Sequence, residues 1–350
     1  MKQGRNHSVD ILRLVGAFAV ICLHNFSASG VWAAEDIVAV TRFAVPLFFL
    51  FSGYFAAHFT VKRKLRQILK IFLLGAAGNL LYLARELLPI KNRYFWIGRF
   101  REIFTPAARK TFLLWNESPL SGHLWFLSAL LYVLLLDLVF SLLLSKWKHR
   151  RPALWCVTGL LLFGGLVLYH VRTAAPSAGF PLYCYRNYLF FGLPFFLTGK
   201  LLRDSDRWHK PLPLPAYLLG IPALCLTALL EYHFTGAWEL YLSSIGMTLL
   251  LSHLAVNHPL QSCPAPAALA AWLGQHTSLL IYLLHIFFLD WVRGAYYAHF
   301  PWQYGFGLYH FIPLAVFLLT TAVSALPPLC LLAVRKLAAR KKGAPKPGAE

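Results

Sequence analysis

Residues 8–25 read SVDILRLVGAFAVICLHN, an apolar run that Asp10, Arg13 and His24 interrupt. With the apolar residues around it, this run reaches the length of about 20 residues that a helix needs to cross a bilayer. A cleaved signal peptide has a uniformly apolar centre, whereas this run holds charged residues. We therefore expect a retained membrane helix that carries ionisable groups into the bilayer.

The spacing of these groups predicts a shared helix face. The separation of Arg13 and His24 corresponds to about three turns, with a residual rotation of about 20° and a rise of about 16 Å. Asp10 precedes Arg13 by the i, i+3 spacing, so it can neutralise or orient the guanidinium. Ionisable residues inside a membrane are costly and usually functional, and an imidazole can act as a base near neutral pH. For His24 the alternative is a structural hydrogen bond to a neighbouring helix.

The composition of the whole chain agrees with a membrane protein. Of the 350 residues, 58% are apolar and only 13% are charged, whereas about 25% of the residues of a soluble domain are charged. This excludes a disordered chain, a coiled coil and an ordinary cytosolic enzyme. The formal net charge of +20 resides in short segments between apolar runs, which is typical of topological signals and not of nucleic-acid binding. We expect lipids, and no nucleic acid, among the partners.

About ten runs are long and apolar enough to span a membrane: 9–29, 38–57, 68–88, 123–145, 153–170, 186–202, 214–231, 238–256, 276–293 and 307–334. The fold class is therefore all-α, a polytopic protein of the cell (inner or cytoplasmic) membrane. Most basic residues outside the runs fall on the side that holds both termini, which predicts cytoplasmic termini. We expect a single membrane domain over residues 1–334 and a basic, disordered cytoplasmic tail over residues 335–350.

The longest connection between runs covers residues 89–122. It mixes tryptophan and phenylalanine with arginine. A connection of this length is often functional, but the same composition suits a helix that lies in the headgroup region. The sequence leaves both interpretations open.

A second set of candidates is basic. Arg63 and Arg66 stand at i, i+3 in the segment TVKRKLRQILK, with lysines beside them. Paired arginines suit a clamp for a phosphorylated cytosolic ligand, and they equally suit a positive-inside signal.

Further polar residues occur at the ends of later runs or inside them. His123 and Trp125 open the run at 123–145, Arg186 and Asn187 open the run at 186–202, and His285 lies within 276–293. His285 and Asp290 have the His-x4-Asp spacing associated with glycerolipid acyltransferases, but we reject that interpretation, because five residues on one helix place the two side chains about 140° apart, too far for a dyad. These residues are second-rank candidates for binding an acceptor or orienting a base.

The sequence lacks the residue patterns of several common kinds of functional site. The six cysteines lie far apart without metal-ligand spacing, so we expect neither a disulfide framework nor a metal site. The sequence also has no phosphate-binding loop and no nucleophile elbow. The polar inventory of histidine, arginine and serine suits group transfer better than ion coupling.

Taken together, these residues resemble the membrane acyltransferase 3 family of integral-membrane O-acyltransferases. The resemblance rests on the Asp-x-x-Arg-x10-His pattern of residues 10–24 and on the Arg63-x-x-Arg66 pair. It continues through VPLFFLFSGYF, HLWFL, RNYLFFGLPFFLTG and SLLIYLLH, which follow in order up to His285. The membrane domain of membrane-bound serine racemases is similar too, so an acceptor or cargo other than a sugar stays open.

The resemblance implies a ten-helix domain that passes an acyl group, usually acetyl, from cytosolic acyl-CoA to an acceptor hydroxyl on the outer side. It implies that Arg13 and His24 are the catalytic pair, assisted by Asp10, and that Arg63 and Arg66 meet the coenzyme. The acceptor would be an extracytoplasmic or lipid-linked glycan, and some members use a further extracytoplasmic domain, so a separate transfer partner is possible. A transporter or flippase of a small polar solute is the alternative.

Overall fold

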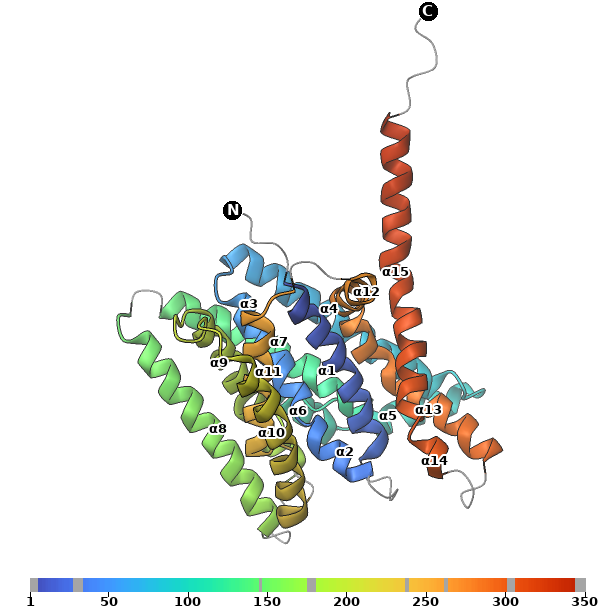
Figure 1. The fold of residues 1–350 in the computed structure, drawn as a ribbon. Coiled ribbons are helices and arrows are strands. Elements are labelled where there is room, and N and C mark those ends of the chain that lie inside the picture. Colours follow the sequence, from blue (N-terminus) through green and yellow to red (C-terminus); the bar gives the residue numbers. More distant parts are fainter. Residues whose placement is uncertain are drawn as a thin grey trace, which may run out of the picture. The chain divides into compact units, whose positions relative to one another are not determined.

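The computed structural model describes residues 6–27, 34–144, 147–174, 181–236, 239–260, 264–300 and 306–343. These residues form helices and no strand (Figure 1). The prediction of an all-α fold is confirmed. Eight of the described helical segments are long and apolar enough to cross a membrane, which confirms a polytopic membrane protein. The count of about ten spans and the cytoplasmic termini stay predictions.

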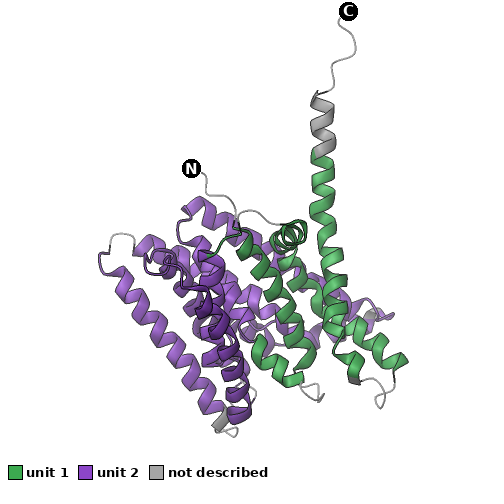
Figure 2. Ribbon diagram, in the orientation of Figure 1, with its two compact units in different colours: residues 1–41, 258–350 green, residues 42–257 purple. Residues whose placement is uncertain are grey.

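The contacts divide the chain into two compact units, coloured separately in Figure 2. Unit 1 combines residues 1–41 with residues 258–350. Its helices are α1 (His7–Phe26), α2 (Ala34–Thr41), α12 (Ala265–His276), α13 (Ser278–His299), α14 (Phe306–Tyr309) and α15 (Ile312–Gly343). Within it α1 packs against α12, α13 and α15, and α13 packs against α15.

Unit 2 comprises residues 42–257. Its longer helices are α3 (Ala44–Ala56), α4 (Val61–Leu87), α5 (Arg93–Ile103), α6 (Pro106–Trp115), α7 (Trp125–Leu143), α8 (Arg150–Ala174), α9 (Leu193–Arg203), α10 (Leu214–Thr235) and α11 (Leu242–Asn257). Three short turns of helix complete it, namely η1 (Gly122–Leu124), η3 (Leu182–Cys184) and the π-helical η4 (Tyr188–Gly192). The closest pairings are α3 with α9, α10 with α11, and α4 with α7.

Local sequence explains where the site-bearing helices begin. The Asn6 side chain accepts a hydrogen bond from the Val9 amide and caps α1, and the Thr60 hydroxyl does the same for Arg63 at the start of α4. Such caps satisfy amide groups that the first helical turn leaves without partners. The ionisable residues of α1 and the basic residues of α4 are thereby held at defined positions along their helices.

Glycine permits the tightest helix pairing in each unit. In unit 2 a Cβ atom on Gly53 would lie 1.8 Å from the Phe196 carbonyl oxygen, and one on Gly199 would lie 1.9 Å from that of Leu50. In unit 1 a Cβ on Gly274 would lie 1.8 Å from the Asp10 carbonyl oxygen. The backbones of α3 and α9, and of α1 and α12, therefore approach as closely as small residues allow in membrane helices.

The structure differs from the sequence-based boundaries at three places. The predicted run 38–57 is divided at residues 42 and 43 into α2 and α3. Helix α12 occupies a segment for which only a connection was expected, and α15 continues to Gly343, into the tail for which disorder was predicted. Residues 344–350 lie outside the described part. The 89–122 connection holds α5 and α6, and Arg99 of α5 bonds Glu86 of α4 at 2.7 Å.

Candidate active site

His24 lies beside a second histidine in unit 1. The ring centroids of His24 and His285 are 5.1 Å apart, which brings the last turn of α1 against the middle of α13. His285 is fully buried, and its Nδ1 lies 2.6 Å from the Tyr282 carbonyl oxygen. Because a carbonyl oxygen can only accept, Nδ1 carries the proton, and in the neutral ring Nε2 is the basic nitrogen. The second-rank candidate His285 thus belongs to the same site as His24.

Arg293 of α13 clamps the end of α1. Its Nη2 donates to the His24 carbonyl oxygen at 2.9 Å and to the Asn25 carbonyl oxygen, and its Nε donates to Asn25 Oδ1 at 3.2 Å. The Tyr309 hydroxyl also donates to the Asn25 carbonyl oxygen, at 2.9 Å. These bonds satisfy carbonyl groups that the end of a helix leaves open. They hold the backbone on which His24 stands.

Asn25 has an unused donor. Its side chain is fully buried, and among the described residues Nδ2 has no hydrogen-bond partner. The bond from Arg293 fixes Oδ1 on the arginine side, so the amide cannot be flipped to exchange its two ends. A buried donor without a partner costs about 1–3 kcal/mol, and such groups in native structures call for a functional explanation. Nδ2 is available to an oxygen of a bound substrate next to His24.

Arg13 and Asp10 form the predicted pair at the other end of α1. Arg13 Nη1 lies 3.1 Å from Asp10 Oδ1, and the side chains are 27% and 3% exposed respectively. The guanidinium thus has a buried counter-charge and retains some exposure. The Asp10 backbone is the one that Gly274 of α12 approaches, so α12 supports this part of α1.

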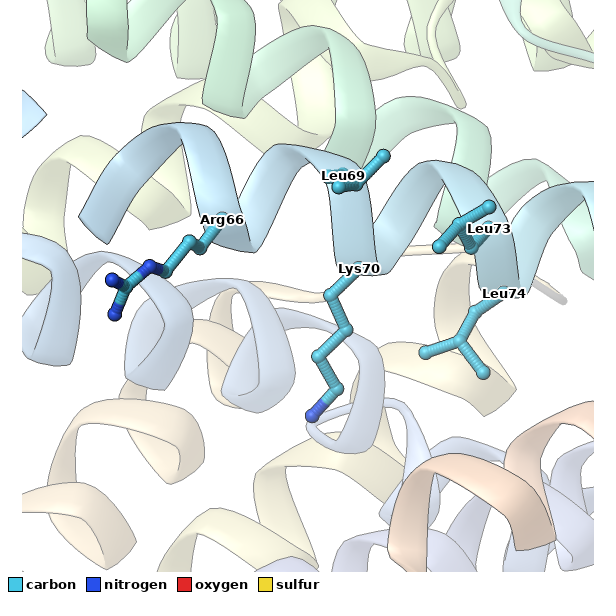
Figure 3. Close-up of a pocket in the computed structure, with 5 residues that line it drawn as sticks. All are labelled: Arg66, Leu69, Lys70, Leu73 and Leu74. Atoms are coloured by element: carbon cyan, nitrogen blue, oxygen red, sulfur yellow. The ribbon is translucent and has the colours of Figure 1, made fainter. Parts of the chain in front are cut away.

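In unit 2 the predicted coenzyme residues stand on the exposed face of α4. Arg63 and Arg66 are both exposed, and the Arg63 guanidinium lies 3.9 Å from the centre of the Phe59 ring. An open surface depression of about 420 Å³ runs along α4, lined by Arg66, Leu69, Lys70, Leu73 and Leu74. In Figure 3, Arg66, Lys70 and Leu74 extend to the same side of the helix. This depression therefore places two cationic side chains, one helical turn apart, beside three leucine side chains.

Lys64, expected among these cations, is instead buried. Its Nζ lies 2.5 Å from Asp137 Oδ2 on α7 and bonds the Ser141 hydroxyl, while Lys200 of α9 bonds the other oxygen of Asp137. Asp137 is fully buried and Lys64 is 4% exposed. A charge buried this way is stable only when its partners are close. The cluster joins α4, α7 and α9 beneath the exposed arginines.

The remaining candidates lie at the other end of the unit 2 helices. Arg186 bonds Glu117 at 3.2 Å, and its guanidinium carbon lies 5.5 Å from the Trp125 ring. His123 is 3% exposed and packs edge-on against the Tyr82 ring, with its Nδ1 2.8 Å from the Ser121 hydroxyl.

Asn187 has a structural task within the same region. Its Oδ1 accepts from the amides of Leu189 and Phe190, and its Nδ2 donates to the carbonyls of Tyr183 and Cys184. The two bonds that Oδ1 accepts cap the start of η4, and the two bonds that Nδ2 donates hold the preceding turn η3. The expected role of Asn187 at the acceptor stays a prediction.

Three residues of these candidate sites were not singled out from the sequence. Arg293 offered a signal, since a charged residue within an apolar helix is a candidate by default. Lys70 continues the Arg66 face by one turn, which the i, i+4 spacing could have indicated. Asn25 gave no signal of its own, because its unused donor depends on a contact with a distant helix.

Comparison with known proteins identifies the family of the chain. Residues 6–328 match the acyltransferase 3 family, described as an acyltransferase domain. The chain belongs to this family. The match covers nearly all of both units, so each is part of a membrane acyltransferase domain, as the resemblance implied.

The chain is also similar to a protein that is named a racemase and not an acyltransferase. The chain is 26% identical over 299 residues to the serine/alanine racemase of Enterococcus gallinarum, which covers 80% of this chain and 40% of that protein. The chain thus spans less than half the length of the relative that it matches. No solved structure matches the chain. Among the described residues, no group of three or more histidine, cysteine, aspartate or glutamate side chains is placed to hold a metal ion.

Proposed function

We propose that this acyltransferase moves an acyl group, in the first instance acetyl, from cytosolic acyl-CoA to a hydroxyl group of an extracytoplasmic or lipid-linked acceptor such as a glycan. The observation that carries the proposal is the pairing of the half-buried His24 with the buried His285, next to the buried Asn25, whose amide has an unused donor and is held by Arg293. Family membership supports the acyl transfer, and the exposed arginines of α4 support a phosphorylated donor.

The chemistry assigns each group a role. His24 takes the proton of the acceptor hydroxyl, whose oxygen forms the new ester bond as the bond from the acyl carbon to the coenzyme sulfur breaks. The proton then passes to the coenzyme thiolate. General base catalysis contributes about 10²–10⁴ in rate. Asn25 Nδ2 donates to the acyl oxygen as charge develops on it, which is the task of an oxyanion donor.

The other members position these groups. His285 presents a basic Nε2 from a ring fixed by its bond to Tyr282. Arg293 sets the direction of the Asn25 amide. Arg13 supplies a positive charge on the same face of α1 as His24, with Asp10 holding its guanidinium. Arg63 and Arg66 retain the phosphates of the coenzyme through charge-assisted hydrogen bonds.

The test uses purified protein in lipid nanodiscs, acetyl-CoA labelled in the acetyl group, and an extract of lipid-linked and surface glycans. The parent should release free coenzyme thiol and label the extract. His24→Gln should bind acetyl-CoA normally and lose about 10²–10⁴ in turnover. His299→Gln, a change of an exposed histidine on α13, is the matched control and should behave as the parent.

Two results would contradict the proposal. A parent that leaves acetyl-CoA intact with every extract would point to solute transport instead. If His24→Gln or His24→Asn retained near-parent turnover, His24 would be a structural hydrogen-bonding residue and not a base. The Arg63→Ala/Arg66→Ala double variant should raise the Kd for acetyl-CoA, whereas normal binding with poor membrane insertion would make these residues topological anchors only.

A further inference from the structure

The depression along α4 combines basic and apolar side chains in a definite order (Figure 3). Arg66 and Lys70 stand one helical turn apart, and three leucines extend the same stripe toward the middle of the helix, namely Leu69, Leu73 and Leu74. The stripe from Arg66 to Leu74 is about 12 Å long. All five residues belong to α4, which is long and apolar enough to cross a membrane. The depression therefore has a cationic end near the start of the helix and an apolar end within the span.

The two cations of the depression have no counter-charge in the described part of the chain. Both are exposed, and neither Arg66 nor Lys70 forms a hydrogen bond or ion pair with another described residue. Lys64, two residues before Arg66, differs from them because it is buried against Asp137 of α7. A guanidinium can donate two hydrogen bonds to one phosphate group, and an ammonium group adds a point charge. Arg66 and Lys70 are therefore suited to a phosphate group.

The leucines of the depression lie on the uncovered face of α4. Leu69 and Leu73 are each 56% exposed, whereas the opposite face of α4 holds its buried residues and packs against α7. In a membrane, hydrocarbon chains cover side chains of this kind. The stripe is nearly as long as the hydrocarbon of one leaflet is thick, roughly 15 Å. One acyl chain of a lipid can therefore follow all three leucines.

A ligand that fits both ends of the depression has a phosphate group and a hydrocarbon chain. The phosphates of a soluble coenzyme can meet the two cations, but its polar body would cover the leucines without a hydrophobic gain. A zwitterionic phospholipid would bring its own ammonium group beside Arg66 and Lys70. An anionic glycerophospholipid has neither drawback. Anionic lipids give the cytoplasmic leaflet its negative surface potential, and the cytoplasmic side is the one predicted for the start of α4.

We propose that the depression along α4 is a binding site for an anionic glycerophospholipid. The phosphate of the lipid lies between Arg66 and Lys70, and one of its acyl chains follows Leu69, Leu73 and Leu74. Arg66 also belongs to the proposed coenzyme clamp, so the lipid and the coenzyme compete for this residue. Binding of the lipid itself does not depend on acyl transfer, and it is measured without coenzyme.

The test measures lipid binding to the delipidated protein in a non-ionic detergent by native mass spectrometry. The probes are phosphatidylglycerol and phosphatidylethanolamine with identical acyl chains, of which only the first has a net negative charge. Each basic residue near a membrane surface strengthens the binding of anionic lipid about fivefold. Two such residues therefore predict a preference of about 25-fold for phosphatidylglycerol. Glycerol 3-phosphate, which has the phosphate without the chains, should not displace it.

Variants then assign the preference to the depression. Arg66→Gln combined with Lys70→Gln removes both cations, leaves Arg63 as a topological signal, and should bring the preference close to one. Arg109→Gln combined with Lys110→Gln removes two exposed cations from α6; it is the matched control and should keep the preference. Lys70→Gln alone should lower the preference about fivefold, which keeps the proposal testable if the double variant does not fold. An unfolding temperature equal to that of the parent shows that a variant is folded.

The outcomes separate a lipid site from ordinary surrounding lipid. A preference that the parent and the control show and the double variant of α4 loses establishes the site. Equal binding of the two lipids to the parent overturns the inference, and so does a preference that the control lowers as much as the double variant of α4 does. Displacement of phosphatidylglycerol by glycerol 3-phosphate also overturns it, because a free phosphate would then be sufficient. None of these results depends on whether the protein consumes acetyl-CoA.

Discussion

The approach of α3 and α9 gives the sharpest structural prediction. A Cβ atom on Gly199 would lie 1.9 Å from the Leu50 carbonyl oxygen, whereas carbon and oxygen atoms in contact normally stay about 3.3–3.6 Å apart. The atom that it meets belongs to the backbone, so no rotation of a side chain relieves the clash. In Gly199→Ala the two helices must separate by about 1.5 Å.

The loss of folding free energy that this separation causes can be estimated. Inserting a methyl group into a packed interface usually costs about 1–3 kcal/mol, and more when the backbone must move. Alanine in a helix recovers about 1 kcal/mol relative to glycine. We therefore expect a net loss of about 2 kcal/mol or more for Gly199→Ala, and the same for Gly53→Ala. The change would also disturb the 2.9 Å bond between Arg203 of α9 and the Tyr54 hydroxyl of α3.

Gly75 of α4 supplies the matched control. No heavy atom lies within 4 Å of a Cβ built there, so Gly75→Ala should gain up to about 1 kcal/mol from helix propensity alone. Thermal unfolding in detergent, followed by fluorescence-detected size-exclusion chromatography, measures both changes. Gly199→Ala should unfold several degrees below the parent and Gly75→Ala at or above it. Equal unfolding temperatures for the two variants would refute the close approach of α3 and α9.

Three further predictions concern side chains. Asn25→Asp keeps the shape of the side chain but removes the Nδ2 donor, so turnover should fall about 10²–10³ at unchanged acetyl-CoA affinity; full turnover would make Asn25 structural. Asp137→Asn leaves the Lys64 ammonium without its counter-charge and should lower stability by about 3–5 kcal/mol, seen as a lower unfolding temperature, which an unchanged temperature would contradict. The pKa of Glu117 is raised by burial despite Arg186, so the stability that its protonated form contributes is present at low pH and is lost as the pH rises through that pKa. The unfolding temperature of the parent should accordingly fall relative to that of Glu117→Gln as the pH rises, and the opposite slope would show that the ion pair dominates.

The sequence was informative wherever a single helix determines the answer. The Asp10 and Arg13 pair follows from the i, i+3 spacing, and the structure confirms it at 3.1 Å. The apolar runs indicated an all-helical membrane fold because bilayer thickness fixes the length of a span. The shared face of Arg13 and His24 needs only the pitch of α1.

The sequence did not predict contacts between segments that lie far apart in the chain. Both His24 and His285 were candidates, yet nothing in either run indicates that their rings lie together. Lys64 is one of the lysines beside Arg63 and Arg66, and the sequence did not distinguish this buried lysine from the exposed arginines. Its burial depends on the ion pair with Asp137 of α7. The spacing of residues along either helix does not predict this pair. The four local hydrogen bonds of Asn187, which hold η3 and cap the start of η4, could not be predicted from the sequence either, and its functional role stays a prediction.

The interior of unit 2 bears on the choice between transfer and transport. A transporter needs a polar path for its solute across the membrane, and unit 2 does have polar groups at both ends. Between them, however, Phe49 packs on Phe126 with ring centroids 4.7 Å apart and on Phe191 at 6.3 Å, while Trp125 meets Phe191 edge-on at 5.6 Å. All four rings are buried. A polar solute crossing this unit would have to displace interlocked aromatic side chains and lose its hydration without compensation. The aromatic packing of unit 2 therefore argues against a continuous polar path through this unit.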